Sequence, residues 1–169
     1  MRTAKFLVLT ALLGLAPAVA ADNHSNFTGT WKMDPARSES AHQDVPSGES
    51  TLVIQLTPTE LSIETTRSED AKPFHETLSF KLDGSETAST GDGGVKVSGK
   101  AHWDGSKLVV ETVRNIQDST VTTLYVHTLS PNGRDLTIDK TLTVQHGYQG
   151  VSGAPTTGHA KDVFIRGAK

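Results

Sequence analysis

The chain has 169 residues, of which 35% are hydrophobic, 21% are charged and only 5% are aromatic, and it contains no cysteine. This length suits one ordinary domain and is short for two. The lack of cysteine excludes disulfide bonds, thiolate metal sites, a cysteine nucleophile and a lipid-anchored amino-terminal cysteine. A formal net charge of −3 argues against a nucleic-acid-binding protein, which would carry a basic surface.

The first twenty residues have the three regions of a secretory signal peptide. Arg2 and Lys5 supply positive charge, residues 6–15 form an almost unbroken apolar run, and Ala-Val-Ala at 18–20 fits a cleavage site. The apolar run is about half of the roughly 20 residues that a membrane-spanning helix needs. We expect residues 1–20 to be removed and the mature protein to be exported, periplasmic or extracellular, and free of integral membrane segments.

The mature chain, residues 21–169, predicts a single all-β domain. Apolar and polar residues alternate strictly along it, which is the pattern of half-buried strands. Threonine and valine, which suit a pleated surface, are abundant throughout. The expected strands span residues 27–33, 51–57, 60–68, 74–82, 95–103, 107–115, 120–129, 135–144 and 160–166.

Short turns join these segments. Asp-Gly at 83–84 and 104–105 and Asn-Gly at 132–133 tolerate positive φ in tight hairpins, and Thr-Pro-Thr at 57–59 makes another reversal. Such connections predict an antiparallel up-and-down meander. Closing the meander into a small barrel of about eight or nine strands covers both of its edges. A two-sheet sandwich is the alternative.

Two segments interrupt the alternation. Residues 34–48 are polar, and we expect them to cross the barrel mouth, with one helical turn at 34–38 capped by Asp34 and begun by Pro35. Residues 146–159 are rich in glycine, and we expect a structureless, mobile loop there.

Three stretches in order carry a family resemblance. They are Phe-Thr-Gly-Thr-Trp-Lys-Met-Asp-Pro-Ala-Arg-Ser at 27–38, Trp-Asp-Gly-Ser-Lys-Leu-Val-Val-Glu-Thr at 103–112 and Leu-Ser-Pro-Asn-Gly-Arg-Asp-Leu-Thr-Ile at 129–138. Together they resemble bacterial secreted lipocalin-like (calycin-type) β-barrel proteins of uncharacterised function, over roughly residues 26–145. The resemblance implies a lipocalin-like barrel and implies no particular function.

The same resemblance implies a barrel floor. In lipocalins the Trp of a Gly-x-Trp motif closes the floor, and an Arg from the last strand packs across its ring. Gly29 and Trp31 match the motif, and Arg166 would be the stacking cation, a favourable arrangement over an indole face. Alternatively, Arg166 is a solvated charge near the chain terminus.

Motifs that carry chemistry are missing from the sequence. It contains no Gly-x-Ser-x-Gly elbow, no His-Glu-x-x-His, no calcium loop and no phosphate or dinucleotide fingerprint. Its seven histidines include no pair at metal-ligand spacing. Glu64, Glu76 and Glu111 fall on predicted strands, where surface decoration is the ordinary role. We therefore predict no catalytic residue, no metal and no cofactor, and a protein that is not an enzyme.

Several expected strands turn polar partway along their apolar face. If these faces point inward, one end of the lumen gathers Arg67, Arg114, Tyr125, His127 and Lys140. Buried cations would need a carboxylate, water or an anionic ligand, and Glu76 is a candidate inward counter-charge. The alternative is that a bulge or a register slip turns these residues to solvent.

Two functions from different classes fit this sequence. The leading hypothesis is an exported binding protein that holds an apolar or amphiphilic small molecule, such as a fatty-acid-like carboxylate, at the five residues named above. The alternative is a structural or interaction module with a filled barrel and no ligand. The sequence indicates no nucleic-acid partner and no oligomeric state.

Overall fold

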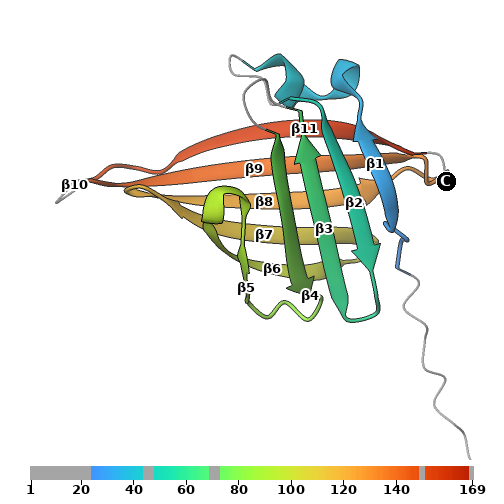
Figure 1. Cartoon of the computed structure of the whole chain (residues 1–169), viewed down its shortest axis with the longest axis horizontal. Coiled ribbons are helices and arrows are strands. Elements are labelled where there is room, and N and C mark those ends of the chain that lie inside the picture. The colour runs from blue at the N-terminus through green and yellow to red at the C-terminus, as the bar shows by residue number, and fades with distance from the viewer. Residues whose placement is uncertain (1–23, 44–47, 69–72, 149–150, 168–169) are drawn as a thin grey trace, which may run out of the picture.

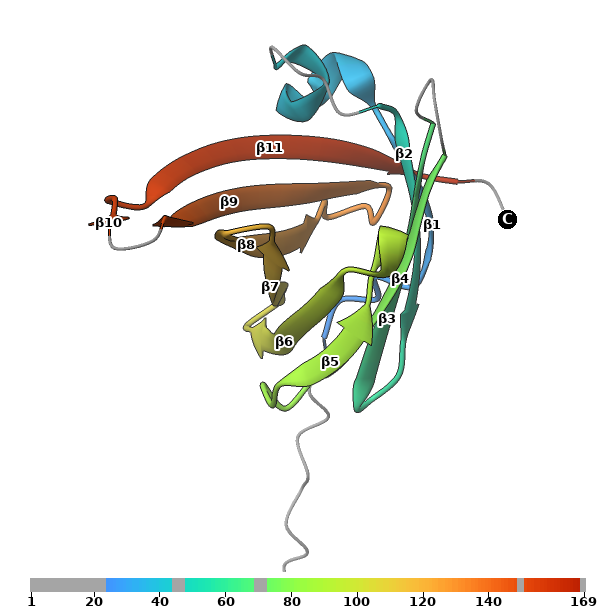
Figure 2. The ribbon, with the colours of Figure 1, turned by 60° about the vertical axis from the view of Figure 1, so that its left-hand side comes forward.

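A computed structural model describes residues 24–43, 48–68, 73–148 and 151–167 of the chain. The predicted signal peptide, residues 1–20, lies outside these ranges. In the described ranges no helix is both long and apolar enough to cross a membrane. The fold is one antiparallel meander whose first and last strands pair with each other, so that the sheet curls into a nearly closed barrel (Figures 1 and 2).

Ten strands form the ring, and neighbours in the sheet follow the order β4-β3-β2-β1-β11-β9-β8-β7-β6-β5. The short β10, Val151–Ser152, pairs with the end of β9 outside the ring. The ring strands are β1 (Gly29–Met33), β2 (Ser50–Leu56), β3 (Glu60–Arg67), β4 (Phe74–Lys81), β5 (Thr87–Thr90), β6 (Lys96–Asp104), β7 (Lys107–Ile116), β8 (Ser119–Leu129), β9 (Asp135–Tyr148) and β11 (Thr156–Arg166). The expected count of about eight or nine strands is therefore too low. The strand missing from the prediction is β5, whose Thr-Ala-Ser-Thr sequence has no apolar alternation.

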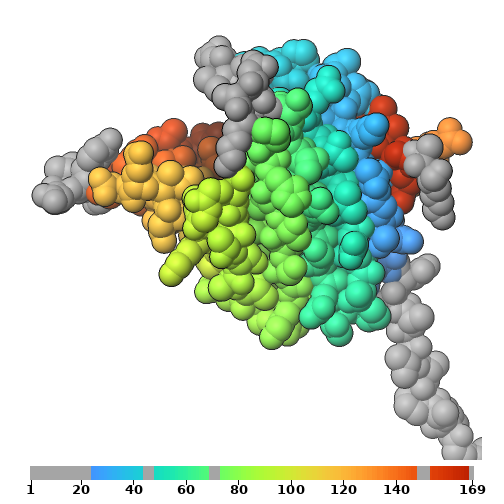
Figure 3. Space-filling view, in the orientation of Figure 1, coloured from blue at the N-terminus to red at the C-terminus, as the bar shows by residue number. Residues whose placement is uncertain are grey.

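The barrel has one discontinuity, between β4 and β5. Asp83–Gly84 was expected to turn a hairpin here, but β5 pairs with β6 and forms no ladder with β4. The Phe80 ring of β4 lies against Gly99 of β6, where an added Cβ would stand 2.5 Å from the ring. Side chains therefore cover the gap, and the atoms of β4 and β5 meet in the space-filling view (Figure 3).

The other predicted turns form as expected. Gly105 joins β6 to β7 and Gly133 joins β8 to β9, both with positive φ.

Between β1 and β2 the chain makes two short 3-10 helices, η1 (Pro35–Arg37) and η2 (Glu39–His42). The Asp34 side chain accepts a hydrogen bond from the backbone N–H of Ala36, which confirms the predicted cap.

A long ribbon replaces much of the expected loop at 146–159. β9 continues to Tyr148 and β11 begins at Thr156, so the structureless segment predicted between His146 and His159 is wrong for most of its described residues, and 149–150 lie outside the described ranges. Ladder pairing, which sets Thr156 opposite Val144, outweighs the low strand propensity of the glycines. Together β8, β9 and β11 project beyond the ends of β1–β4 (Figures 1 and 2).

The half of the barrel that contains Trp31, the lower half, is filled by apolar side chains. The fully buried members include Phe27, Trp31, Leu61, Leu108 and Leu136. The Trp31 indole N–H donates to the Phe27 carbonyl at 2.9 Å, and the Arg166 guanidinium lies 4.1 Å from the centre of the Trp31 ring. Gly29 has a φ of 145°, and a Cβ there would come within 2.9 Å of the Arg166 side chain. Arg166 thus covers the floor tryptophan, and the absence of a side chain at Gly29 leaves space for its guanidinium.

Candidate functional site

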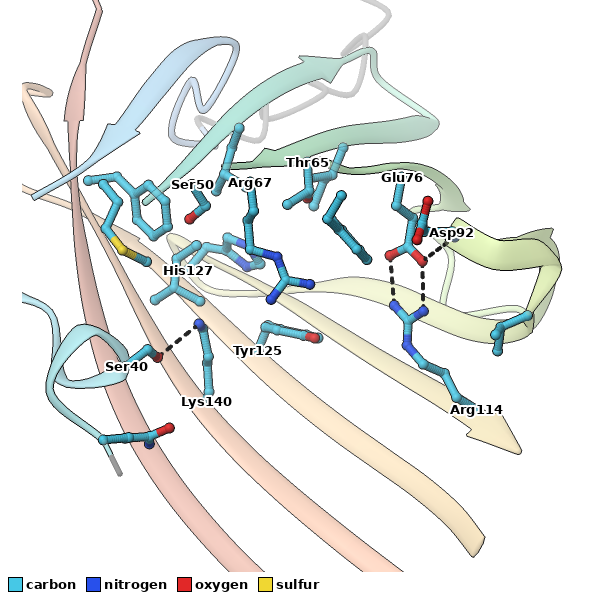
Figure 4. A pocket seen from close by; sticks show the side chains of 18 of the residues that line it. Ser40, Ser50, Thr65, Arg67, Glu76, Asp92, Arg114, Tyr125, His127 and Lys140 are labelled. Carbon is cyan, nitrogen blue, oxygen red and sulfur yellow. Dashed lines mark hydrogen bonds and ion pairs between the residues drawn. The ribbon is translucent and has the colours of Figure 1, made fainter. Parts of the chain in front are cut away.

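Above the packed floor, the barrel contains a cavity of about 490 Å³ that is open to solvent. The five residues predicted for the lumen all line it, as Figure 4 shows: Arg67, Arg114, Tyr125, His127 and Lys140. Apolar side chains of Met33, Leu52, Ile138 and Phe164 form its lower boundary. The structure thus brings residues from β3, β7, β8 and β9 to a single site.

Strand register explains this convergence. Successive side chains on a strand point to opposite faces of the sheet, so residues two apart share a face. Tyr125 pairs with Lys140 across β8 and β9, and His127 pairs with Ile138 one inward position nearer the floor. Arg67 follows Leu61 and Ile63 on the inner face of β3. No bulge interrupts these ladders, so the polar residues stay on the face that the alternation assigns them.

Glu76 and Arg114 form an ion pair inside the barrel. Two bonds of 2.7 Å join the Arg114 guanidinium to both carboxylate oxygens of Glu76, and the Asp92 backbone N–H donates to the same carboxylate at 3.3 Å. Hydrogen bonding to Glu76 raises the pKa of Arg114, against the opposing effect of burial. The predicted surface role is therefore wrong for Glu76, which is buried and is the inward counter-charge. Glu64, in contrast, pairs with His75 on the exposed face.

A second ion pair joins Lys140 to Asp162. The Lys140 ammonium contacts the Asp162 carboxylate and lies 3.3 Å from the Ser40 hydroxyl. Ser40, in η2, also donates to Asp162 through its backbone N–H at 3.0 Å and its hydroxyl at 2.7 Å. Burial would raise the pKa of the Asp162 carboxyl, but the hydrogen bonds and charge of Lys140 and the bonds from Ser40 outweigh it and lower that pKa. This pair fixes η2 over the mouth of the barrel.

His127 lies at the bottom of the charged region and is almost completely buried. Its Nδ1 is 3.0 Å from the Leu108 carbonyl oxygen, which can only accept, so Nδ1 carries the hydrogen. Burial lowers the pKa of His127 to about 4, opposed by the bond to Leu108 and assisted by the charge of Lys140. His127 is therefore a neutral imidazole at neutral pH.

Arg67 is the third cation that lines the cavity, and it belongs to neither of these ion pairs. Its guanidinium reaches into the cavity 4.0 Å from the centre of the Phe74 ring, on the neighbouring strand. Its Nε is buried without a hydrogen-bond partner, and within the described ranges no carboxylate forms an ion pair with it. Figure 4 shows Arg67 near Tyr125 and His127, with Glu76 and Asp92 at the other end of the cavity. An anion that enters at this end of the cavity would meet a cation that forms no ion pair with a described carboxylate, while the Asp92 carboxylate lines the other end.

Sequence reasoning missed part of the site. Asp162, Ser40 and Asp92 were not singled out, although Asp162 shares the inner face of β11 with Phe164. The alternation of β11 thus carried a signal for Asp162. Nothing in the pattern of the segments around Ser40 and Asp92 points inward, because both lie in 3-10 helices between strands. In the described part of the chain, no group of three or more His, Asp or Glu side chains is arranged to hold a metal ion.

Comparison with known proteins establishes the fold. The structure is similar to a REP1-NXSQ fatty acid transporter, with a TM-score of 0.53 and 15% identity over 84% of this chain and 96% of that one. It is also similar to a secretary abundant heat soluble (SAHS) protein from Ramazzottius varieornatus, with a TM-score of 0.53 and 16% identity over 83% of this chain and 95% of that one. Apo lipid binding protein 8 of Caenorhabditis elegans gives a TM-score of 0.50 and 14% identity over the same shares. No protein-family model and no curated protein matches the sequence.

Proposed function

We propose that this protein is an exported binding protein, not an enzyme, that holds a small amphiphile by a single anionic headgroup such as a carboxylate. The observation that carries the proposal is the Arg67 guanidinium, which stands in the cavity without a carboxylate partner among the described residues. A buried donor without a partner costs free energy, and an ionised oxygen acceptor would recover it. Arg114 and Lys140 already have internal partners and would shape the site around the headgroup.

Further observations support the same proposal. A cavity of about 490 Å³ has the volume of a typical small-molecule site, whereas the alternative of a packed module requires a filled barrel. Two proteins of the same fold are named a fatty acid transporter and a lipid binding protein. Export is supported by the signal-peptide pattern of residues 1–20.

The test compares three ligands that share one chain and differ in headgroup charge. Calorimetric titration of the delipidated mature protein with dodecanoate, dodecanol and dodecyltrimethylammonium should show dodecanoate binding at least about tenfold more tightly than the other two, since a hydrogen bond to a charged group contributes 1.5–3 kcal/mol. Arg67→Gln should remove this preference. Arg134→Gln, in the exposed turn between β8 and β9, is the matched control and should keep it.

Each other outcome counts against the proposal. Equal affinities for the three ligands would mean that no cation selects the headgroup. A preference that survives Arg67→Gln would assign the headgroup to another residue. No binding of any amphiphile would favour the structural or interaction module.

A further inference from the structure

The inner face of the sheet continues beyond the charged part of the cavity. From the floor outward, β8 and β9 present the opposed pairs His127–Ile138, Tyr125–Lys140, Thr123–Leu142 and Val121–Val144. Polarity along this face rises at Tyr125–Lys140 and falls again beyond it. The strands are long enough to carry these outer residues past the barrel mouth, on the projecting ribbon seen at the left of Figure 1.

A trough runs along the part of the inner face that lies beyond the charged residues. It is a further cavity of about 240 Å³, lined in part by Leu142, Gly158 and Ala160, and it shares Tyr125 and Lys140 with the first cavity, so the two are adjacent. Leu142 forms one side, and β11 contributes Gly158, His159 and Ala160, with Gly158 paired directly with Leu142. A Cβ added to Gly158 would meet no atom within 4 Å, so the trough is open over the glycine.

Apolar groups at this end of the sheet stand in water. Leu142 is 41% exposed and Ile116, at the end of β7, is 45% exposed, and they are two of the three large apolar residues of the described chain with such exposure. Covering them would be favourable in proportion to the apolar area removed from water. A hydrocarbon chain leaving the cavity past Lys140 would lie against Leu142.

On the floor side of Arg67 the cavity is closed by core side chains. Below Arg67 the cavity ends on Leu52 and Phe164, which are buried in the core cluster and packed against the floor residues. A chain directed downward and longer than the cavity would need these side chains to move, at the cost of strain in a close-packed core. The trough requires no such rearrangement.

Resting on the proposed function, we infer that the amphiphile binds with its headgroup inside, at Arg67, and its hydrocarbon chain directed outward along the trough, over Gly158 and against Leu142. The ligand class is then a single unbranched chain longer than the cavity. Affinity should depend on chain length through residues of the projecting ribbon, although these lie outside the barrel itself.

The experiment is a chain-length series with two leucine variants of β11. Calorimetric titration with hexanoate, octanoate, decanoate and dodecanoate is carried out on the wild type, Gly158→Leu and Thr157→Leu. Gly158→Leu fills the trough, where φ is not in the left-handed region and space is open. Thr157→Leu places the same side chain one residue away, on the outer face of the strand.

In the wild type, each added methylene should strengthen binding roughly fourfold along the series. Gly158→Leu should bind hexanoate like the wild type and should lose at least about tenfold for dodecanoate, and Thr157→Leu should follow the wild type throughout. Stearate carrying a nitroxide near its methyl end should broaden the amide signals of Leu142 and Gly158 rather than those of Leu52 and Phe164.

Three results would overturn the inference. Chain-length gains that are unchanged in Gly158→Leu, with broadening at Leu52 and Phe164, would place the chain toward the floor while leaving the proposed function intact. A concentration-dependent dimer that Gly158→Leu abolishes, with unchanged alkanoate affinities, would assign the trough to a second copy of the protein. Failure of every alkanoate to bind the wild type would overturn the proposed function as well.

Discussion

The lower half of this barrel, at the floor, and the upper half, around the cavity, are built from the same strands but differ in their inward side chains. In the lower half the inward side chains form an apolar core cluster of buried and partly buried residues, and Arg166 covers the floor. In the upper half they surround a cavity and include three cations, two of them in ion pairs. The change comes between successive inward-facing residues, from Phe164 to Asp162 on β11 and from Ile138 to Lys140 on β9.

This difference separates stability from binding. Burial of apolar surface in the lower half favours folding, whereas burial of polar groups in the upper half costs free energy unless each has a partner. Ion pairs with Glu76 and Asp162 offset that cost for Arg114 and Lys140. Arg67 forms no such ion pair in the described chain, and its Nε and the Thr112 hydroxyl are the buried side-chain polar atoms recorded there without a hydrogen-bond partner. Of the two, Arg67 is the one that lines the cavity, where a ligand can reach it.

The largest effect should come from the floor. Trp31→Ala removes a fully buried indole that packs against the core and under Arg166, and it should lower the free energy of unfolding by about 3–5 kcal/mol. Urea denaturation followed by circular dichroism measures this loss. A cost under about 1 kcal/mol would remove Trp31 from the barrel floor and erase the contrast between the halves.

Within the upper half, a single broken ion pair should approach the cost of a floor mutation. Glu76→Gln leaves the Arg114 guanidinium without its counter-charge inside the barrel, and should lower the free energy of unfolding by about 3 kcal/mol. Glu64→Gln, on the exposed face of β3, is the matched control and should cost less than about 1 kcal/mol. Equal costs for the two variants would show that Arg114 finds water or another acceptor once Glu76 is changed.

The boundary between the halves should respond to pH through His127. Its pKa is about 4 in the folded protein against an ordinary 6.5, so between these values the unfolded chain takes up a proton that the folded protein does not. The free energy of unfolding should therefore fall as pH decreases from 6.5 to 4, by about 3 kcal/mol from this group. Asp162 adds its own loss only below its ordinary pKa of 3.8, because its folded pKa is lowered.

Urea titrations at several pH values isolate the histidine contribution. His127→Gln should flatten the decline between pH 6.5 and 4, and His75→Gln, whose side chain is exposed, should leave it in place. A decline that is unchanged in His127→Gln would mean that the imidazole is not held neutral by burial.

Strand alternation predicted the inward direction of Arg67 and Lys140, because the face of a side chain depends only on its position along one strand. The partners of the cations were harder to predict. Asp162 meets Lys140 only through the pairing of β9 with β11, and Glu76 meets Arg114 across the cavity. Both contacts depend on register and curvature, which one strand's pattern does not contain. β5 and the outer ribbon were missed because ladder pairing holds polar and glycine-rich segments that have weak propensity of their own.

The smallest effect tests the contrast on a single strand. Leu61 and Ile63 lie two residues apart on the inner face of β3, but Leu61 is fully buried in the core while Ile63 borders the cavity. Leu61→Ala opens a void in a packed region and should cost about 2–5 kcal/mol, whereas Ile63→Ala enlarges space that already exists and should cost about 1–2 kcal/mol less. The urea midpoints of the two variants measure this difference. Equal losses would mean that Ile63 is as tightly packed as Leu61, and that the hollow half begins farther from the floor than the cavity lining indicates.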